Sequence, residues 1–482
     1  MSAVDPIIGN PAMSRRRWML NAGALAGAGL TLPRLLQLEA QARLVGTRAK
    51  SCIVFFLEGG PAHQDLWDMK PNAPAEIRGD FQPISTSVPG VQICEHLPLL
   101  SKQMHHLALV RSVHHTIVDH NAGAYYALTG RMPLVGGRLI VRDEPDNFPC
   151  YGAVLAHLTT TKPTLPSFVQ VPEIMSNNGH DLPGQRAGFL GPARDPLVVG
   201  DASAPGYQVP GLSLPGDLSL DRLFERRALL TQLNGRSPAH GAEQDNAQEL
   251  AGVSAHYARA FDLLSAGTTR KAFDLGQEPS RVRQRYGLPD RADRSVEARK
   301  FGGLPHLGQC TLLARRLIEA GVRLVTIASG RRFDQAWDTH RSHFPLLKES
   351  LLPYADRAIS ALIADLHERG MLDETLVVIM GEFGRTPRLG QITSGAGADR
   401  AGRDHWPHCY SVLFCGGGTR GGAVYGASDR FAAYPQTDPV TLEDIASTIY
   451  HALGIPSETR ILDALGRPHS VATGKPILPI FG

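Results

Sequence analysis

The chain has 482 residues, of which 43% are hydrophobic and 20% are charged, a composition typical of a globular protein. Lysine and arginine total 49 against 46 for aspartate and glutamate, which argues against a protein that binds nucleic acid through a uniformly basic face. Nineteen histidines, several of them close to carboxylates, point instead to metal binding or acid–base chemistry.

The N-terminal segment has the features of an export signal. Arg15, Arg16 and Arg17 precede an apolar, glycine- and alanine-rich run over residues 20–32, and residues 40–42 form a small-x-small cleavage pattern. We therefore predict a Tat signal peptide over residues 1–42 and a periplasmic or extracellular location. A membrane helix is the weaker alternative, because a spanning helix needs about 20 apolar residues. If it is not cleaved, this segment is the only part expected to contact a membrane.

Short apolar runs followed by turn or polar residues predict buried strands in the remaining chain. In chain order these runs cover residues 51–57, 107–113, 322–328, 375–380 and 410–414. Helical patterns cover residues 122–128, 312–320 and 344–369. Helices that alternate with wholly apolar strands predict an α/β fold with a mainly parallel sheet and helices on both faces.

Other segments predict loops and peripheral elements. Residues 131–220 are rich in glycine and proline, and residues 221–300 are charged and helical in pattern. We therefore expect one α/β domain over residues 43–482 that contains a cap-like insertion over 131–300. The six cysteines form no CxxC motif, and their disulfide pairing cannot be read from their spacing. The glycine-rich run 416–422 lacks the Lys-Ser/Thr of a phosphate-binding loop and predicts a turn between strands.

Polar clusters follow or approach four of the predicted strand ends. Carboxylates and imidazoles together are ligands for zinc and its first-row neighbours, and carboxylate-rich sites also bind calcium. Because the carboxyl ends of parallel strands meet at one edge of a sheet, we expect these clusters to form one site. The clusters comprise Glu58, His63, Asp65 and Asp68; His114, His115, Asp119 and His120; Asp334, Asp338, His340 and His343; and Glu382, Arg385, Arg403, Asp404, His405 and His408.

Four stretches of the sequence resemble the DUF1501 family, from about residue 52 to the C-terminus. They are LEGGPAHQDLWDMKP, WDTH, ETLVVIMGEFGRTPR and GRDHWPHCYSVLFCGGGTRGGAVYG. The resemblance implies an exported bacterial protein related to the sulfatases, with the alkaline phosphatase-like fold. It also implies a divalent metal, which would be zinc, calcium or manganese. The implied metal ligands are Glu58, Asp338, His340, Glu382 and His405.

Two positions depart from the sulfatase pattern. Phe383 stands where a second metal-binding histidine or asparagine is expected after Glu382. The stretch 128–131 (LTGR) matches the end of the sulfatase signature, and counting back from it places His120 at the position of the nucleophile. No serine or cysteine is available there for conversion to formylglycine. His120 is then a metal ligand, a base, or a nucleophile that forms phosphohistidine.

The resemblance implies an exported, metal-dependent hydrolase of sulfate or phosphate esters, acting on a small molecule or a polysaccharide. The implied catalytic residues are His120, His63 and Arg385, with Arg385 binding the oxyanion through its planar guanidinium. The alternative is a non-catalytic envelope protein that binds a metal or a protein partner. An isomerase or phosphomutase of the same superfamily is a third hypothesis, which meets the same lack of a hydroxyl nucleophile. No nucleic-acid partner is expected, and the sequence leaves open whether the protein is an enzyme.

Overall fold

The computed structural model describes residues 49–159, 165–209, 267–290, 304–330 and 336–482, together with single positions between 222 and 232. The predicted signal peptide over residues 1–42 lies outside the described residues, and so do Asp334 and most of the predicted helical region 221–300. Within the described residues no helix is long and apolar enough to cross a bilayer.

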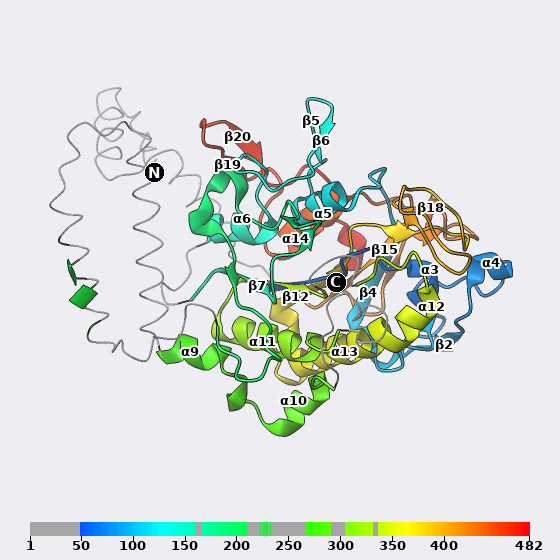
Figure 1. Ribbon diagram of the computed structural model, residues 1–482, viewed down its shortest axis with the longest axis horizontal. Helices are drawn as coiled ribbons and strands as arrows, with labels where there is room; N and C mark the ends of the chain where they lie inside the picture. The colour runs from blue at the N-terminus through cyan, green and yellow to red at the C-terminus, as the bar shows by residue number, and fades with distance from the viewer. Residues whose placement is uncertain are drawn as a thin grey trace, which may run out of the picture.

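An eight-stranded sheet forms the centre of the fold (Figure 1). Within it, β15 runs antiparallel to its neighbours β12 and β4, and every other pair of neighbouring strands is parallel. The predicted α/β fold with a mainly parallel sheet is therefore confirmed. In order across the sheet, the strands are β10 (Leu197–Val198), β7 (Phe168–Val171), β11 (Leu324–Ala328), β1 (Ser51–Phe56), β12 (Thr375–Met380), β15 (Tyr410–Cys415), β4 (Leu107–Val113) and β16 (Val424–Tyr425).

Helices cover both faces of this sheet, as predicted. Helices α11 (Leu307–Ala320) and α13 (Leu352–Glu368) lie on one face, and α5 (His120–Thr129), α6 (Tyr151–Leu158) and α14 (Leu442–Ala452) lie on the other (Figure 1). Side chains alternate along each strand, so β1 sends Ile53 and Phe55 into the first core and Val54 and Phe56 into the second. All six residues of β1 are buried because both faces of the sheet are covered.

Two segments differ from the sequence prediction. Residues 131–220 were expected to form loops and short elements over one face, but they supply α6 and the sheet strands β7 and β10. Strand β7 has only four residues, and Gln170 interrupts its apolar pattern. The predicted helix over 344–369 contains a π-helical turn, Leu347–Leu351, directly before α13. Pro353, in the first turn of α13, cannot donate the α-helical hydrogen bond to Glu349.

The cysteines and the glycine-rich run have structural roles. All six cysteines are buried and free, so no disulfide forms among them. The run 416–422 is a turn between β15 and β16, as predicted, and Gly416, Gly417 and Gly418 have positive φ angles. An added Cβ at Gly416 would lie 2.3 Å from the backbone oxygen of Leu372, so the turn requires glycine there.

Candidate metal centre

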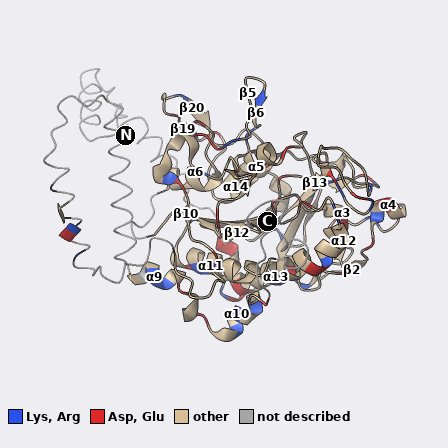
Figure 2. Cartoon of the chain, viewed as in Figure 1, with Lys and Arg blue, Asp and Glu red and all other residues tan. Residues whose placement is uncertain are grey.

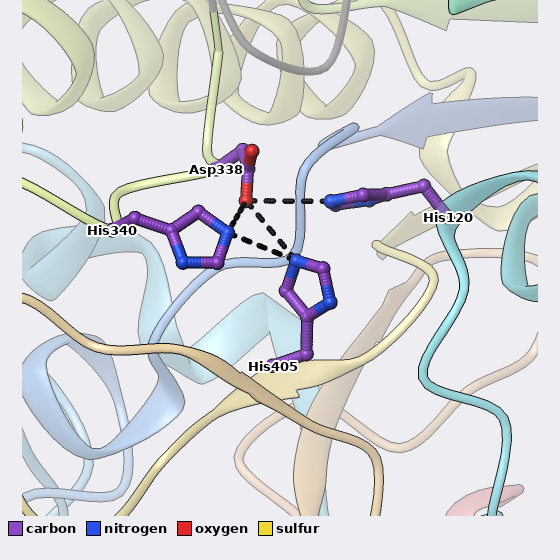
Figure 3. Close-up of side chains that lie close together, drawn as sticks. All are labelled: His120, Asp338, His340 and His405. Carbon is purple, nitrogen blue, oxygen red and sulfur yellow. Dashed lines mark hydrogen bonds and ion pairs between the residues drawn. The ribbon is translucent and has the colours of Figure 1, made fainter. Parts of the chain in front are cut away.

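Four buried side chains from three segments of the chain meet at the carboxyl edge of the sheet (Figure 3). His120 begins α5 after strand β4, and Asp338 and His340 follow strand β11. His405 lies in β14 (His405–Trp406), which pairs with β13 (Gly384–Arg385). One possible ligand atom of each residue lies within 4.8 Å of those of the other three. The fold therefore brings together residues that are far apart in the sequence.

The four side chains are arranged around Oδ1 of Asp338. This oxygen lies 2.7 Å from Nε2 of His340, 3.3 Å from Nε2 of His120 and 3.4 Å from Nε2 of His405. The Nε2 atoms of His340 and His405 are 3.0 Å apart. Three imidazole nitrogens that converge on one carboxylate oxygen form a donor set suited to zinc and neighbouring first-row metals.

The Nδ1 atoms of the three histidines each have an acceptor outside the cluster. His340 Nδ1 donates to the carbonyl of Gly397 at 2.5 Å, and His405 Nδ1 donates to the carbonyl of Val118 at 2.8 Å. His120 Nδ1 lies 2.6 Å from Glu382 Oε1. Because a carbonyl can only accept, a neutral His340 or His405 carries its proton on Nδ1 and turns the Nε2 lone pair toward the cluster. When both rings are neutral in this way, their Nε2 lone pairs face each other at 3.0 Å, an arrangement that a bound cation would stabilise.

The charges in the cluster suit metal binding at Asp338 and His405 but not, without loss of a proton, at His120. Burial lowers the pKa of His405 to about 4, which keeps its imidazole neutral at physiological pH. Burial also acts to lower the pKa of His120, but the carboxylates of Asp338 and Glu382 outweigh it and raise that pKa to about 9. The pKa of Asp338 lies well below its usual range in spite of burial, because Arg385 and His120 stabilise the carboxylate. The cluster thus holds an ionised carboxylate, a neutral imidazole at His405 and a protonated imidazole at His120, and His120 must lose its proton before it can bind a metal.

Glu58 and Glu382, which the resemblance placed among the ligands, lie outside the group of four. Glu382 Oε1 accepts from the backbone of Gly59 at 2.8 Å and contacts His120, so Glu382 orients that histidine. Glu58 accepts from the backbone and hydroxyl of Ser329, both at 2.9 Å, and from the backbone of Gly330. Burial raises the pKa of Glu58 to about 8. Glu58 therefore holds the turn that follows β11.

The contacts of Arg385 differ from its expected role as an oxyanion binder. Its side chain has no exposed area, and its Nε donates to the carbonyl of Gly60 at 2.9 Å. One Nη atom donates to the carbonyl of Arg403 at 3.2 Å, and the other donates to Gly59 and, at 2.5 Å, to Asp338. Arg385 consequently fixes Asp338 and the loop after β1, and it offers no exposed donor to a substrate.

A second buried network, of hydrogen bonds and ion pairs, holds the segments that carry candidate ligands. Arg403 makes a bidentate ion pair with Asp65, at 2.6 and 3.0 Å. His343 Nε2 lies 2.8 Å from the same carboxylate, and its Nδ1 lies 2.7 Å from the hydroxyl of Thr339. Thr339 stands between Asp338 and His340, and Arg403 lies two residues before His405 in the chain. The network therefore links two of the three segments that carry candidate ligands, those of Asp338 and His340 and of His405.

His63 is not among the four residues of the cluster. His63 is fully buried, and neither ring nitrogen has a hydrogen-bond partner within the described part of the chain. Burial lowers its pKa to about 4. It packs beside Gly384, where an added Cβ would lie 3.2 Å from His63 Nδ1. The catalytic role that the resemblance implied for His63 gains no support from these contacts.

Glu382 provides a prediction about metal affinity. We expect Glu382→Gln to lower zinc affinity about 10- to 100-fold, because outer-shell carboxylates orient ligand histidines and raise their basicity. The measurement is a competition titration against a chromophoric chelator. Glu374→Gln, which changes an exposed carboxylate paired with Lys50, is the matched control. Equal dissociation constants for the two variants would show that Glu382 does not act on the site.

The described chain is thus an α/β protein with a candidate centre of three histidines and one aspartate at the carboxyl edge of its sheet. It belongs to the family described as "Protein of unknown function (DUF1501)", whose match spans residues 49–481. This confirms the family that the sequence motifs indicated. No curated protein is a significant match to the chain.

The chain is similar to several solved structures at low identity. One is a mutant of the alkaline phosphatase PafA, with a TM-score of 0.41, 12% identity and coverage of 90% of this chain and 99% of that chain. Another is the sulfatase PsFucS1 from Pseudoalteromonas sp., with a TM-score of 0.37, 13% identity and coverage of 88% of this chain and 72% of that chain. A third is the phosphonate monoester hydrolase SpPMH from Silicibacter pomeroyi, with a TM-score of 0.32, 13% identity and coverage of 90% of this chain and 76% of that chain.

Proposed function

We propose that the protein is an exported, metal-dependent hydrolase of sulfate or phosphate esters. Asp338, His340 and His405 would bind one divalent metal ion, with His120 as the fourth ligand. The supporting observation is the convergence of three Nε2 atoms on Asp338 Oδ1. This set of three imidazoles and one carboxylate favours zinc over calcium, because calcium takes oxygen ligands. Of the two metals that remain, zinc is favoured over manganese.

The residues around the centre have definable tasks in this proposal. A bound divalent ion supplies Lewis acidity, which polarises an ester oxygen and lowers the pKa of a coordinated water. Arg385 keeps Asp338 ionised, and Glu382 holds the ring of His120 in place. The four residues of the cluster are only 5–6% exposed, so an ester group would have little room to reach them. This favours a terminal or slender ester group as the substrate.

A non-catalytic, metal-binding envelope protein is the second candidate. Two observations favour it. Four protein donors would fill the four positions of a zinc ion, as in structural zinc sites, whereas catalytic sites keep one position open. His120 also occupies the sequence position at which the sulfatase signature has its nucleophile, so the usual covalent route is missing. Under this proposal the metal stabilises a surface that binds a partner in the envelope.

Turnover by the zinc-loaded protein separates the two proposals. If the protein is a hydrolase, it cleaves aryl sulfates or aryl phosphates, and chelation abolishes the activity. We expect His120→Ala to lower kcat/KM at least about 100-fold with an unchanged circular dichroism spectrum. His451→Ala, an exposed histidine in α14, is the control and retains full activity. Stoichiometric metal without turnover on either ester class would reject the hydrolase and favour the binding protein.

A further inference from the structure

The chain between β13 and β14 contains a loop over residues 391–401 that has neither helix nor strand. In Figure 2, β13 lies in a part of the molecule made up mainly of loops. The two ends of the 391–401 loop lie side by side, because the backbone N–H of Gly390 donates to the carbonyl of Gly402 at 2.9 Å. A surface loop of this length whose ends lie close together is often functional.

Apolar packing contributes little to the position of this loop. None of the residues 391–401 is buried, and Ile392, the one large apolar residue among them, is 66% exposed. An added Cβ at Gly395 or Gly397 would have no atom within 4 Å. A segment with few buried apolar contacts opens at a low cost in free energy. The loop can therefore open and close without disturbing the core of the protein.

Hydrogen bonds join this loop to the segments that carry two of the candidate metal ligands. The carbonyl of Gly397 accepts from His340 Nδ1 at 2.5 Å, and the backbone N–H of Asp399 donates to the carbonyl of His340 at 3.0 Å. The hydroxyl of Thr393 donates to the carbonyl of His405 at 2.7 Å. The contacts that keep the loop closed are therefore polar contacts with the metal centre and its supporting backbone.

His340 connects the loop to the cluster of four. Its Nδ1 donates to Gly397, and its Nε2 lies 2.7 Å from Asp338 Oδ1. A cation bound at Nε2 withdraws electron density from the imidazole, which makes Nδ1–H a stronger donor to the loop. We propose that residues 391–401 form a lid on the His340 side of the metal centre, and that metal binding by His340 holds this lid closed. The proposal rests on the metal centre of the proposed function, and it does not require ester hydrolysis.

A lid at this position would control access to the metal centre. The four residues of the cluster are only 5–6% exposed, so a metal ion or another ligand needs a movement of the surrounding chain to reach them. Opening of the lid removes the acceptor of His340 Nδ1 and uncovers that ring. Because the coupling between two equilibria is reciprocal, lid closure raises metal affinity by the factor by which the metal favours closure.

Hydrogen–deuterium exchange of the full chain, read by mass spectrometry with and without zinc, tests this proposal. The backbone amides of Thr393, Ser394 and Asp399 report on the lid, because each donates a hydrogen bond in the closed state. We expect stoichiometric zinc to slow their exchange at least about fivefold. The control is the 463–467 loop, where Asp463 accepts two backbone hydrogen bonds within its own hairpin. Zinc should not change exchange in this control loop.

A substitution in the lid tests the coupling from the other side. The carboxylate of Asp399 accepts from the backbones of Ser342 and Ala401, both at 3.0 Å, so Asp399→Ala loosens the lid and leaves every candidate ligand unchanged. We expect this variant to exchange faster in the lid and to bind zinc at least about fivefold more weakly. Asp463→Ala is the matched control, because it loosens the 463–467 loop in the same way and should retain the zinc affinity of the wild type.

The possible failures of the lid and of the metal centre can be told apart. Equal exchange of the lid with and without stoichiometric zinc would overturn the lid alone. Equal protection of the lid and the 463–467 loop would do the same, because it would show general stabilisation of the fold. Equal zinc affinities for Asp399→Ala and Asp463→Ala would also reject the coupling. A protein that binds no zinc would overturn both the lid and the metal centre.

Discussion

Replacing His405 by alanine is expected to reduce the zinc content of the purified protein from about one ion per chain to nearly none. His405 Nε2 lies 3.0 Å from His340 Nε2 and 3.4 Å from Asp338 Oδ1, so it is central to the proposed ligand set. Loss of a direct ligand should lower affinity by more than the roughly 100-fold upper range for outer-shell changes. Elemental analysis by mass spectrometry, with a chelator titration for the affinity, makes the measurement.

The matched control for this prediction is His451→Ala, which changes an exposed histidine in α14. It should retain one zinc ion per chain. Comparable zinc in the His405→Ala protein would mean that the metal binds elsewhere, and the proposed centre would be wrong. Far-ultraviolet circular dichroism of both variants distinguishes loss of the ligand from loss of the fold.

Replacing Arg403 by methionine should cause the largest loss of stability among single substitutions around the site. Arg403 and Asp65 are both fully buried and form a bidentate ion pair. The substitution would leave the carboxylate of Asp65 buried with only His343 as a partner, and it would remove the donor to the carbonyls of Ile77, Thr386 and Pro387. Breaking a buried pair from one side costs about 3–5 kcal/mol of unfolding free energy.

Urea unfolding in the presence of a chelator measures this loss without the stabilisation that a bound metal adds. Lys50→Met is the control, because it removes an ion pair whose side chains are 66% and 53% exposed. Exposed pairs of this kind contribute little, so the control should unfold near the wild-type midpoint. If Arg403→Met unfolds at the same urea concentration as Lys50→Met, the network does not hold the site together.

The main elements of the fold could be predicted from the sequence because they depend on local patterns. Apolar runs in the sequence predicted the strands β1, β11 and β12. Glycines predicted where helices α5 and α11 end, at Gly130 and Gly321. The direction of β15 could not be predicted, since an apolar run carries no information about which way its strand points. Strand β7 was missed because it has four residues and one of them, Gln170, is polar.

All four residues of the cluster were among the predicted site residues, but the sequence could not separate them from Glu58 and Glu382, and the reason is physical. Asp338, His340, His405 and His120 were singled out because polar residues at the carboxyl ends of parallel strands share one edge of the sheet. The sequence does not show which donors form hydrogen bonds with the oxygens of a buried carboxylate. Glu58 is held by the amides of Ser329 and Gly330, which come from a different strand end. The role of Arg403 was missed for the same reason, since its partner Asp65 lies 338 residues earlier.

Zinc-edge X-ray absorption spectroscopy of the protein purified from an exporting cell tests the central claim most directly. The account predicts one zinc ion per chain with nitrogen and oxygen ligands at about 2.0–2.2 Å. It also predicts multiple scattering from three imidazole rings, falling to two in the His405→Ala protein if that variant is loaded at high zinc. A stably folded protein without metal, or a metal bound only by oxygen ligands, would contradict a centre formed by His120, His340 and His405.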